Sequence, residues 1–214
     1  MRYNNGDANF KFDTIGTRLQ GNHDDWSWEF EGAYQFGDNS DGSDHSAGFW
    51  VSGLGRKFPC CPGSPSLWFY YDWASGDDDL GAGNGYHHLF PLAHKYLGFM
   101  DLFGRRNIES PNLLLTMSPR EKVKLLVWYY YLFLENKNDT PYNLNMAAFN
   151  AGNAPASADL GHEIDVAVTY AINPRTNLLF GYSHFFAGQY YDLTPNVPFD
   201  GDADFFYTQF TSNF

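Results

Sequence analysis

The sequence is poor in charge, and above all in positive charge. Charged residues make up 18% of its 214 residues, and 13 Lys and Arg stand against 25 Asp and Glu, for a formal net charge of −12. A soluble domain usually carries about 25% charged residues. Because binding to nucleic acid needs a basic surface, this composition argues against a nucleic-acid partner.

The sequence also lacks a long apolar run. A transmembrane helix needs about 20 consecutive apolar residues, whereas the strongest apolar stretch, Val123 to Leu134, is shorter and contains Lys124. Two classes therefore remain. The chain is either a soluble protein or a membrane β-barrel, whose strands each carry only a weak hydropathy signal.

Metal-ligand patterns are scarce as well. The two cysteines, Cys60 and Cys61, are adjacent, and no second pair stands at metal-binding spacing. Acidic residues gather in three Gly-, Asn- and Ser-rich segments: Asp38, Asp41 and Asp44; Asp77, Asp78 and Asp79; Asp200, Asp202 and Asp204. None has the spacing of a calcium loop. We predict no cofactor and no dedicated metal centre, and interpret these segments as solvated loops, with cation binding as the alternative.

Aromatic residues, by contrast, are abundant at 19%, and they alternate. Within residues 25–37, Trp26, Trp28, Phe30, Tyr34 and Phe36 fall on one face, and Ser27, Glu29, Glu31 and Gln35 on the other. This period of two indicates a β-strand. The run is longer than the usual strand of about five or six residues, and it suits a membrane strand of roughly 9–11 residues.

The same pattern predicts nine strands, near residues 8–20, 25–37, 46–55, 67–74, 110–118, 122–133, 163–170, 178–186 and 206–214. The connections alternate in length: 21–24, 57–64, 118–121 and 173–175 are the shorter set, and 37–45, 75–109, 136–160 and 188–203 the longer. Transmembrane barrels have short periplasmic turns and long extracellular loops. We therefore predict an all-β, antiparallel transmembrane β-barrel.

The predicted strand count indicates a partial barrel. Bacterial single-chain barrels have an even number of strands, and an open sheet edge in lipid is prohibitively costly. No apolar signal segment follows Met1. We therefore expect residues 1–214 to be one partial outer-membrane barrel domain that lacks N-terminal strands.

Four segments resemble the alginate-export family of outer-membrane barrels: 94–108 (HKYLGFMDLFGRRNI), 160–165 (LGHEID), 181–188 (GYSHFFAG) and 202–207 (DADFFY). The resemblance implies the C-terminal half of a closed barrel of eighteen strands in the bacterial outer membrane. It also implies passage of an anionic polysaccharide or similar solute. Outer-membrane lipid would surround the chain, and the barrel-assembly machinery would read the terminal aromatic residue, Phe214.

Charged residues on the predicted inward faces are the candidates for lining a pore. Alternation places Arg18, Lys122 and Lys124 inward, together with five acids: Glu29, Glu31, Asp72, Glu163 and Asp165. Cations in a lumen attract a polyanion because low-dielectric walls focus the field. Cross-strand ion pairs that stiffen the barrel are the alternative role.

Two further groups have alternative roles. Arg105 and Arg106 lie in the longest connection and either fold into the lumen or form a solvated pair. Five aromatic residues are predicted to face inward, where they either stack on sugar rings or fill the lumen: Trp50, Trp68, Tyr70, Trp128 and Tyr130.

Signs of catalysis are weak. Ser183 and His184 are adjacent, so on a strand they face opposite sides and cannot form a catalytic pair. Glu163 and Asp165 share a face at roughly 6–7 Å, a spacing that in a barrel lumen favours selectivity or structure. We therefore expect a channel and not an enzyme. A soluble carbohydrate-binding β-sandwich and an outer-membrane enzyme remain as alternatives.

Overall fold

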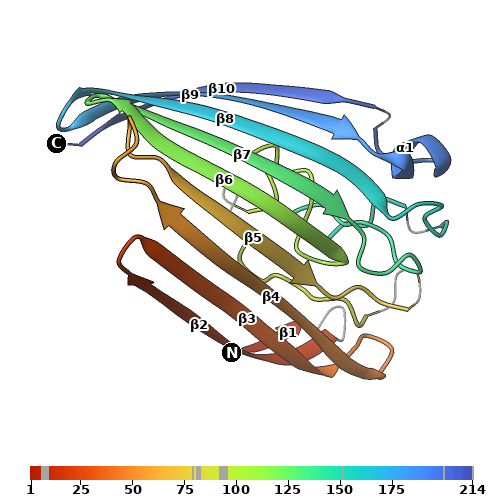
Figure 1. Ribbon diagram of the computed structural model, residues 1–214. Helices are drawn as coiled ribbons and strands as arrows, with labels where there is room; N and C mark the ends of the chain where they lie inside the picture. The colour runs from red at the N-terminus through yellow and green to blue at the C-terminus, as the bar shows by residue number, and fades with distance from the viewer. Residues whose placement is uncertain are drawn as a thin grey trace.

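The computed structural model describes residues 1–5, 10–78, 80, 83–91, 96–150, 152–199 and 201–213. These residues form one ten-stranded antiparallel sheet in which every strand pairs with its neighbours in sequence (Figure 1). The strands are β1 (Arg2–Asn5), β2 (Phe10–His23), β3 (Trp26–Asp38), β4 (Asp44–Lys57), β5 (Ser66–Ala74), β6 (Ile108–Arg120), β7 (Val123–Phe133), β8 (Asp159–Asn173), β9 (Thr176–Ala187) and β10 (Ala203–Ser212). The one helix in the described part of the chain is α1 (Gln189–Leu193).

The sheet is open. Its order runs from β1 at one edge to β10 at the other, and no pairing joins these two edges within the described residues. The predicted all-β antiparallel class is thus confirmed, whereas the closed barrel is not seen. No helix in the described residues is long and apolar enough to cross a membrane.

All nine predicted strands are present, from β2 to β10, with lengths of 9 to 15 residues. The count of nine was nevertheless one short. The four-residue β1 pairs with the start of β2, with Arg2 opposite Asp13 and Asn5 opposite Phe10. Its Arg-Tyr-Asn-Asn sequence is too short and too polar to show a period of two.

The connections separate the two ends of the sheet. Residues 24–25, 58–65, 121–122 and 174–175 join strands at one end, and 39–43, 75–107, 134–158 and 188–202 at the other. The short-and-long alternation has one exception. Residues 39–43 form a tight connection, shorter than 58–65, because β3 and β4 extend further than predicted. In Figure 1 the short turns gather at the left, and the long connections and α1 lie to the right.

The two faces of the sheet differ in what covers them. We call the face that carries Trp28, Phe69 and Phe206 the outer face; these side chains are 44%, 51% and 66% exposed. The opposite, inner face carries Gln35, Glu163 and other polar residues that are fully buried. The sheet curves so that this inner face surrounds parts of the long connections (Figure 1).

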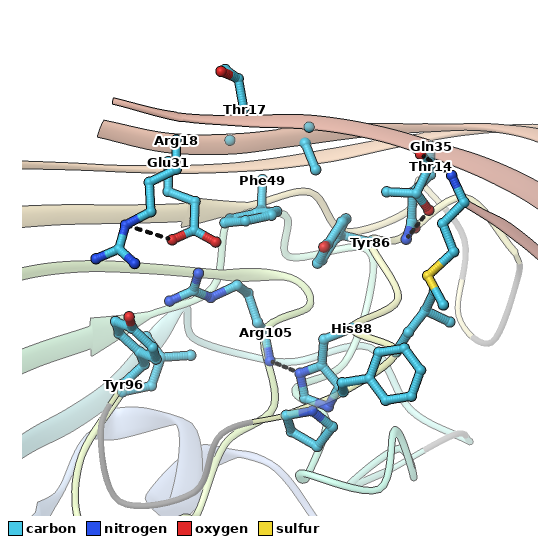
Figure 2. A pocket seen from close by; sticks show the side chains of 18 of the residues that line it. Thr14, Thr17, Arg18, Glu31, Gln35, Phe49, Tyr86, His88, Tyr96 and Arg105 are labelled. Carbon is cyan, nitrogen blue, oxygen red and sulfur yellow. Dashed lines mark hydrogen bonds and ion pairs between the residues drawn. The ribbon is translucent and has the colours of Figure 1, made fainter. Parts of the chain in front are cut away.

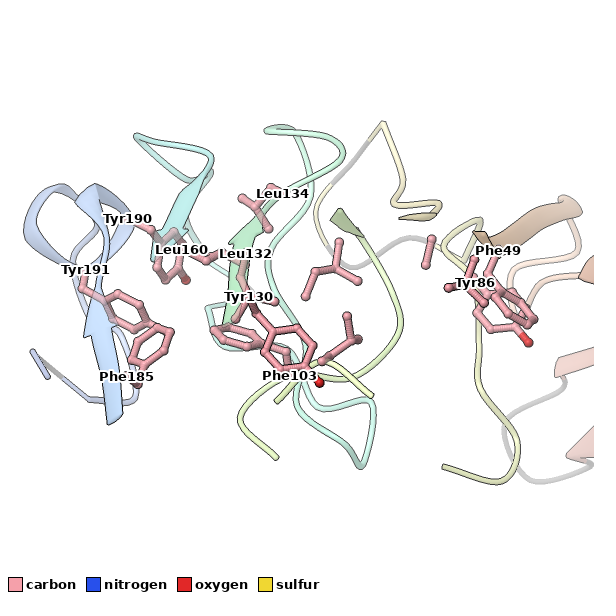
Figure 3. Close-up of a cluster of buried hydrophobic side chains, with 14 of the residues drawn as sticks. Phe49, Tyr86, Phe103, Tyr130, Leu132, Leu134, Leu160, Phe185, Tyr190 and Tyr191 are labelled. Atoms are coloured by element: carbon pink, nitrogen blue, oxygen red, sulfur yellow. The ribbon is translucent and has the colours of Figure 1, made fainter. Parts of the chain in front are cut away.

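The buried apolar core lies between the inner face and the long connections. Strand residues such as Tyr130 and Phe185 pack there with Phe103 from the 75–107 connection and with Tyr190 and Tyr191 from α1 (Figure 3). The core is therefore displaced toward the long-loop end of the sheet. The long connections are folded parts of the protein, since they bury apolar surface against the strands.

The acidic segments are more structured than predicted. Asp41 accepts hydrogen bonds from Ser43, and Asp77 accepts one from the backbone N–H of Asn84. Asp204 lies within β10, where Tyr182 and His184 bind its carboxylate. No group of three or more acidic, His or Cys side chains among the described residues could hold a metal ion. Asp79, Asp200, Phe214 and the residues 94–95 of the family resemblance lie outside the described residues.

Candidate functional site

The described residues of the connection between β5 and β6, 75–107, lie against the inner face and are held there at several points, of which three bear on the site. At the first point, the side chain of Gln35 on β3 makes two hydrogen bonds to the backbone of His87. Its Nε2 donates to the His87 carbonyl at 2.8 Å, and its Oε1 accepts from the His87 N–H at 3.0 Å. Gln35 is fully buried. A buried amide side chain needs such partners, because an unpaired polar group loses its hydration without compensation.

The second point is a bend whose backbone N–H groups bind two acidic side chains. Leu97 and Gly98 have φ angles of +62° and +99°, so the following backbone N–H groups point toward β8. Phe99 donates to Asp165 at 3.1 Å, and Met100 donates to Glu163 at 2.9 Å. A side chain at Gly98 would collide with Glu163. Successive N–H groups in such a bend form an anion-binding concavity, here filled by the protein's own acids.

The third point is the ion pair between Arg105 and Asp72 of β5, at 2.6 Å between Nη2 and Oδ1. Both side chains are largely buried, with 13% and 6% of their surface exposed. The guanidinium also lies over the rings of Phe49 and Tyr96, at 4.8 and 5.0 Å from their centres. Cation–π contacts strengthen when the charge is removed from water.

His88 joins this connection to the next one. Its Nε2 lies 2.7 Å from the carbonyl of Leu144, and its Nδ1 lies 3.1 Å from the backbone nitrogen of Arg105. The Arg105 N–H can only donate, so Nδ1 must accept and Nε2 must carry the proton. This requires neutral imidazole. Burial lowers the pKa of His88, and the positive charge of Arg105 lowers it further.

Arg106 and Asn107 anchor the 134–158 connection. The Arg106 guanidinium lies 4.3 Å from the ring centre of Tyr142 and 3.8 Å from Asp139. Asn107 donates to the carbonyls of Asn136 and Thr140 and accepts the Asn136 N–H at 2.7 Å. Burial raises the pKa of Asp139, against the effects of Tyr142 and Arg106. The two connections therefore form one packed unit.

A cavity of about 600 Å³ lies between this unit and strands β2 to β4. Arg18, Glu31, Phe49, Tyr86, Tyr96 and Arg105 are among the residues that line it (Figure 2). Arg18 pairs with Glu29 at 3.2 Å and with Glu31 at 3.6 Å. Guanidinium groups beside aromatic rings suit a ligand that has both polar hydrogen-bond acceptors and flat apolar faces.

Most of the charged pore-lining candidates do lie on the inner face, but they are paired. Four of the eight belong to the ion pairs above: Arg18, Glu29, Glu31 and Asp72. Glu163 and Asp165 bind the bend. Lys124 also lies on this face, lining a second cavity. Lys122 differs from the prediction, because it lies in the exposed turn before β7.

The structure decides between the two alternatives for the loop arginines. Arg105 and Arg106 are buried against strands and aromatic rings, so the solvated pair is wrong. Sequence reasoning missed Tyr86, His87, His88 and Tyr96, which hold or line the cavity. Their only signal was the clustering of aromatic and His residues in a segment that was expected to be solvated.

The inward aromatic residues were predicted correctly in four of five cases. Trp68 stacks on Tyr70 with ring centres 5.3 Å apart, and Trp128 stacks on Tyr130 at 5.1 Å. Trp50 faces outward instead. It lies opposite Gly32 and Trp73 and stacks on Tyr71. The four inner rings form one row in which each packs on the next.

Residues 2–197 match the family model described as alginate export. The chain belongs to the alginate-export family. The match runs from β1 through α1 and so includes both connections that fold against the inner face. No curated protein matches the chain.

Proposed function

We propose that this alginate-export family member forms part of the wall of an outer-membrane channel. The channel passes an anionic polysaccharide of the alginate type or smaller solutes, and the chain has no enzymatic role. The observation that carries the proposal is the inversion of the two faces: aromatic side chains are exposed on the outer face and carboxylates are buried on the inner face. Family membership supports the same function.

The outer face suits contact with outer-membrane lipid. Its exposed apolar side chains run along many strands, from Ile15 and Leu19 on β2 to Phe206 and Phe210 on β10. Soluble proteins rarely expose apolar patches larger than a few hundred Å². Lipid-facing bands of barrels carry such residues, with aromatic side chains at the membrane interfaces.

The open edges favour closure into a barrel. The free sides of β1 and β10 present backbone N–H and C=O groups that no described strand pairs. Each such group costs several kcal/mol in lipid, so spanning sheets close on themselves. We propose that further strands complete the barrel, as the family resemblance implies. In this proposal the assembly machinery recognises the terminal aromatic residue, Phe214.

The two alternatives have less support. A sandwich buries its core between two packed sheets, whereas the described residues form one sheet whose outer face is exposed. For an enzyme, Ser183 lies on the buried inner face, and His184 pairs with Asp204 on the exposed side. Ser183 and His184 therefore point to opposite faces of the sheet, as their adjacency predicts, and cannot form a catalytic pair.

Ion selectivity in planar bilayers tests the proposal. Arg18→Gln with Arg105→Gln removes two inner-face cations and leaves Glu29, Glu31 and Asp72 without them, so the reversal potential in a salt gradient should shift toward cation preference. Arg56→Gln is the matched control, because Arg56 lies beside Trp26 on the outer face. Failure of the wild-type protein to conduct, or equal shifts in the control, would contradict the channel.

A further inference from the structure

A second cavity, of about 720 Å³, lies on the inner face toward the short-turn end. It shares no lining residue with the cavity around Arg105. Phe99, which follows the bend at Gly98, contributes to its wall. The cavity therefore lies on the other side of the inserted connection, and the ion pairs described above do not explain it.

The register of the sheet builds this cavity. Seven inner-face residues lie directly opposite one another across consecutive strands from β4 to β10: Lys57, Ser66, Thr116, Leu126, Ala167, Gly181 and Tyr207. All but Gly181 line the cavity. A second row, one pair nearer the turns, places Lys124 opposite Thr169 and Thr169 opposite Leu179.

Small residues make the hollow. Ala167 and Gly181 stand where the neighbouring rows carry larger side chains, and the ring of Tyr207 lies directly over Gly181. A Cβ at Gly181 would meet the Tyr207 ring, so only glycine allows this approach. Leu126, Leu179 and the rings of Tyr207 and Phe99 then form an apolar wall.

Two lysines supply all the formal charge in the lining. Lys57 and Lys124 are exposed, and neither has an ion-pair partner among the described residues. This contrasts with Arg18 and Arg105, which are neutralised by acids. The lysines stand on β4 and β7, three strand spacings or roughly 14 Å apart along the sheet. Cations thus border the apolar wall on two sides, in a chain whose net charge is −12.

We propose that this cavity binds a small carboxylate with an apolar, ring-sized body. The carboxylate contacts a lysine and accepts further hydrogen bonds from the hydroxyls of Ser66, Thr116 or Thr169, and the body packs on Leu126, Leu179 and Tyr207. A free sugar acid fits less well, because its hydroxyl groups would be left unpaired against the apolar wall. The inference rests on the proposed function in that the inner face must be open to solutes.

Equilibrium dialysis with the protein in lipid nanodiscs tests the inference, with empty nanodiscs subtracted. Phenylacetate should bind about tenfold more tightly than its neutral amide, because only the acid pairs with a lysine. Lys57→Gln with Lys124→Gln should remove that preference. Lys122→Gln is the matched control, since Lys122 lies in the turn outside the cavity, and it should keep the preference.

Two further measurements isolate the cavity. Ala167→Phe, which fills the hollow, should abolish binding of phenylacetate, and galacturonate should bind more weakly than phenylacetate to the wild-type protein. Equal binding of acid and amide, binding that survives Ala167→Phe, or tighter binding of galacturonate would each overturn the inference. Phenylacetate binding without bilayer conductance would remove the channel and keep the site. Conductance without phenylacetate binding would do the reverse.

Discussion

The outer and inner faces of the sheet are built from alternate residues of the same strands, yet their surroundings are opposite. On β10 and β9, Phe206 and Phe210 are 66% and 65% exposed, while Phe185 and Ser183 of the inner face have no exposed surface. A soluble protein would show the opposite arrangement, because it buries large apolar side chains and leaves carboxylates in contact with water. The difference supports the proposal that the outer face contacts lipid, and it shows that folded chain covers the inner face at its long-loop end.

Each face also has its own way of being stabilised. No described part of the chain packs over the outer face, so the stability of that face depends on the medium that surrounds it. The inner face depends on specific donors: backbone N–H groups for Glu163 and Asp165, and Arg105 for Asp72. Buried carboxylates without such partners are strongly destabilising.

The largest expected effect comes from placing a cation on the outer face. Val127 lies near the middle of β7 and faces outward, and Val127→Arg should cost about 2–4 kcal/mol, the value for a cation at the bilayer midplane. Leu126→Arg, one residue earlier, faces the second cavity and should cost less. Reversible folding into lipid vesicles measures both. Equal costs would show that the two faces do not meet different solvents.

A smaller effect should follow from replacing the acids that hold the bend. Glu163→Gln with Asp165→Asn keeps the shapes but replaces one carboxyl oxygen of each side chain by an amide nitrogen that cannot accept, which should weaken the anchoring by on the order of 1 kcal/mol. Hydrogen exchange of the Phe99 and Met100 amides measures it. Asp25→Asn, in an exposed short turn, is the control. Unchanged protection of the two amides in the double variant would show that Glu163 and Asp165 do not hold the bend.

Acidification should loosen the same connection through His88. Its lowered pKa means that the neutral form is favoured by folding, so its contribution is complete above the ordinary histidine pKa and is lost as the pH falls through the lowered value. Between about pH 7.5 and about pH 5, the wild type should lose roughly 1 kcal/mol more stability than His88→Asn. Urea unfolding at both pH values measures this.

The exposed His23 supplies the control for that experiment, because it lies near a short turn with 82% of its side chain exposed. His23→Asn should retain the pH dependence of the wild type. If His88→Asn and His23→Asn respond alike to acid, His88 does not link the two connections as described.

The smallest expected effect on stability concerns the two neighbouring lysines. Lys124→Glu and Lys122→Glu should each change stability by within about 0.5 kcal/mol, as surface substitutions do. Their effects on selectivity should differ, because Lys124 lines the second cavity and Lys122 lies in the turn. Reversal potentials should shift toward cations more for Lys124→Glu. A larger shift for Lys122→Glu would contradict the assigned positions.

Local sequence patterns predicted the positions of the strands well. They predicted which face each residue lies on only where apolar and polar residues alternate regularly. In β3 the aromatic and polar residues alternate on both sides of Gly32 and Ala33, and the structure confirms both faces. In β4, Phe49 and Trp50 are adjacent and both aromatic, so the period of two gives no decision. The register settles it, by placing Trp50 opposite Gly32 on the outer face. One register step reverses every side chain of a strand.

The candidate site was less predictable, because long-range partners create it. Nothing local to Arg105 indicates Asp72, 33 positions earlier, and nothing near Gly98 indicates Glu163. The sequence did contain the acids and the loop arginines as candidates, and it left their pairing open. The sequence does not show how the 75–107 connection runs along the inner face. Its path is set by packing in the core around Tyr130 and Phe185 and not by local propensity.

Accessibility of spin labels along β3 tests the central claim most directly. A nitroxide placed in turn at each position from Trp26 to Phe36, with the protein in bilayers, reports collisions with oxygen, which concentrates in lipid, and with a water-soluble nickel chelate. The account predicts a period of two: oxygen collisions peak at Trp28, Phe30 and Phe36, and fall at Ser27, Glu29 and Gln35. Equal access of the nickel chelate to both sets, or no alternation at all, would contradict it.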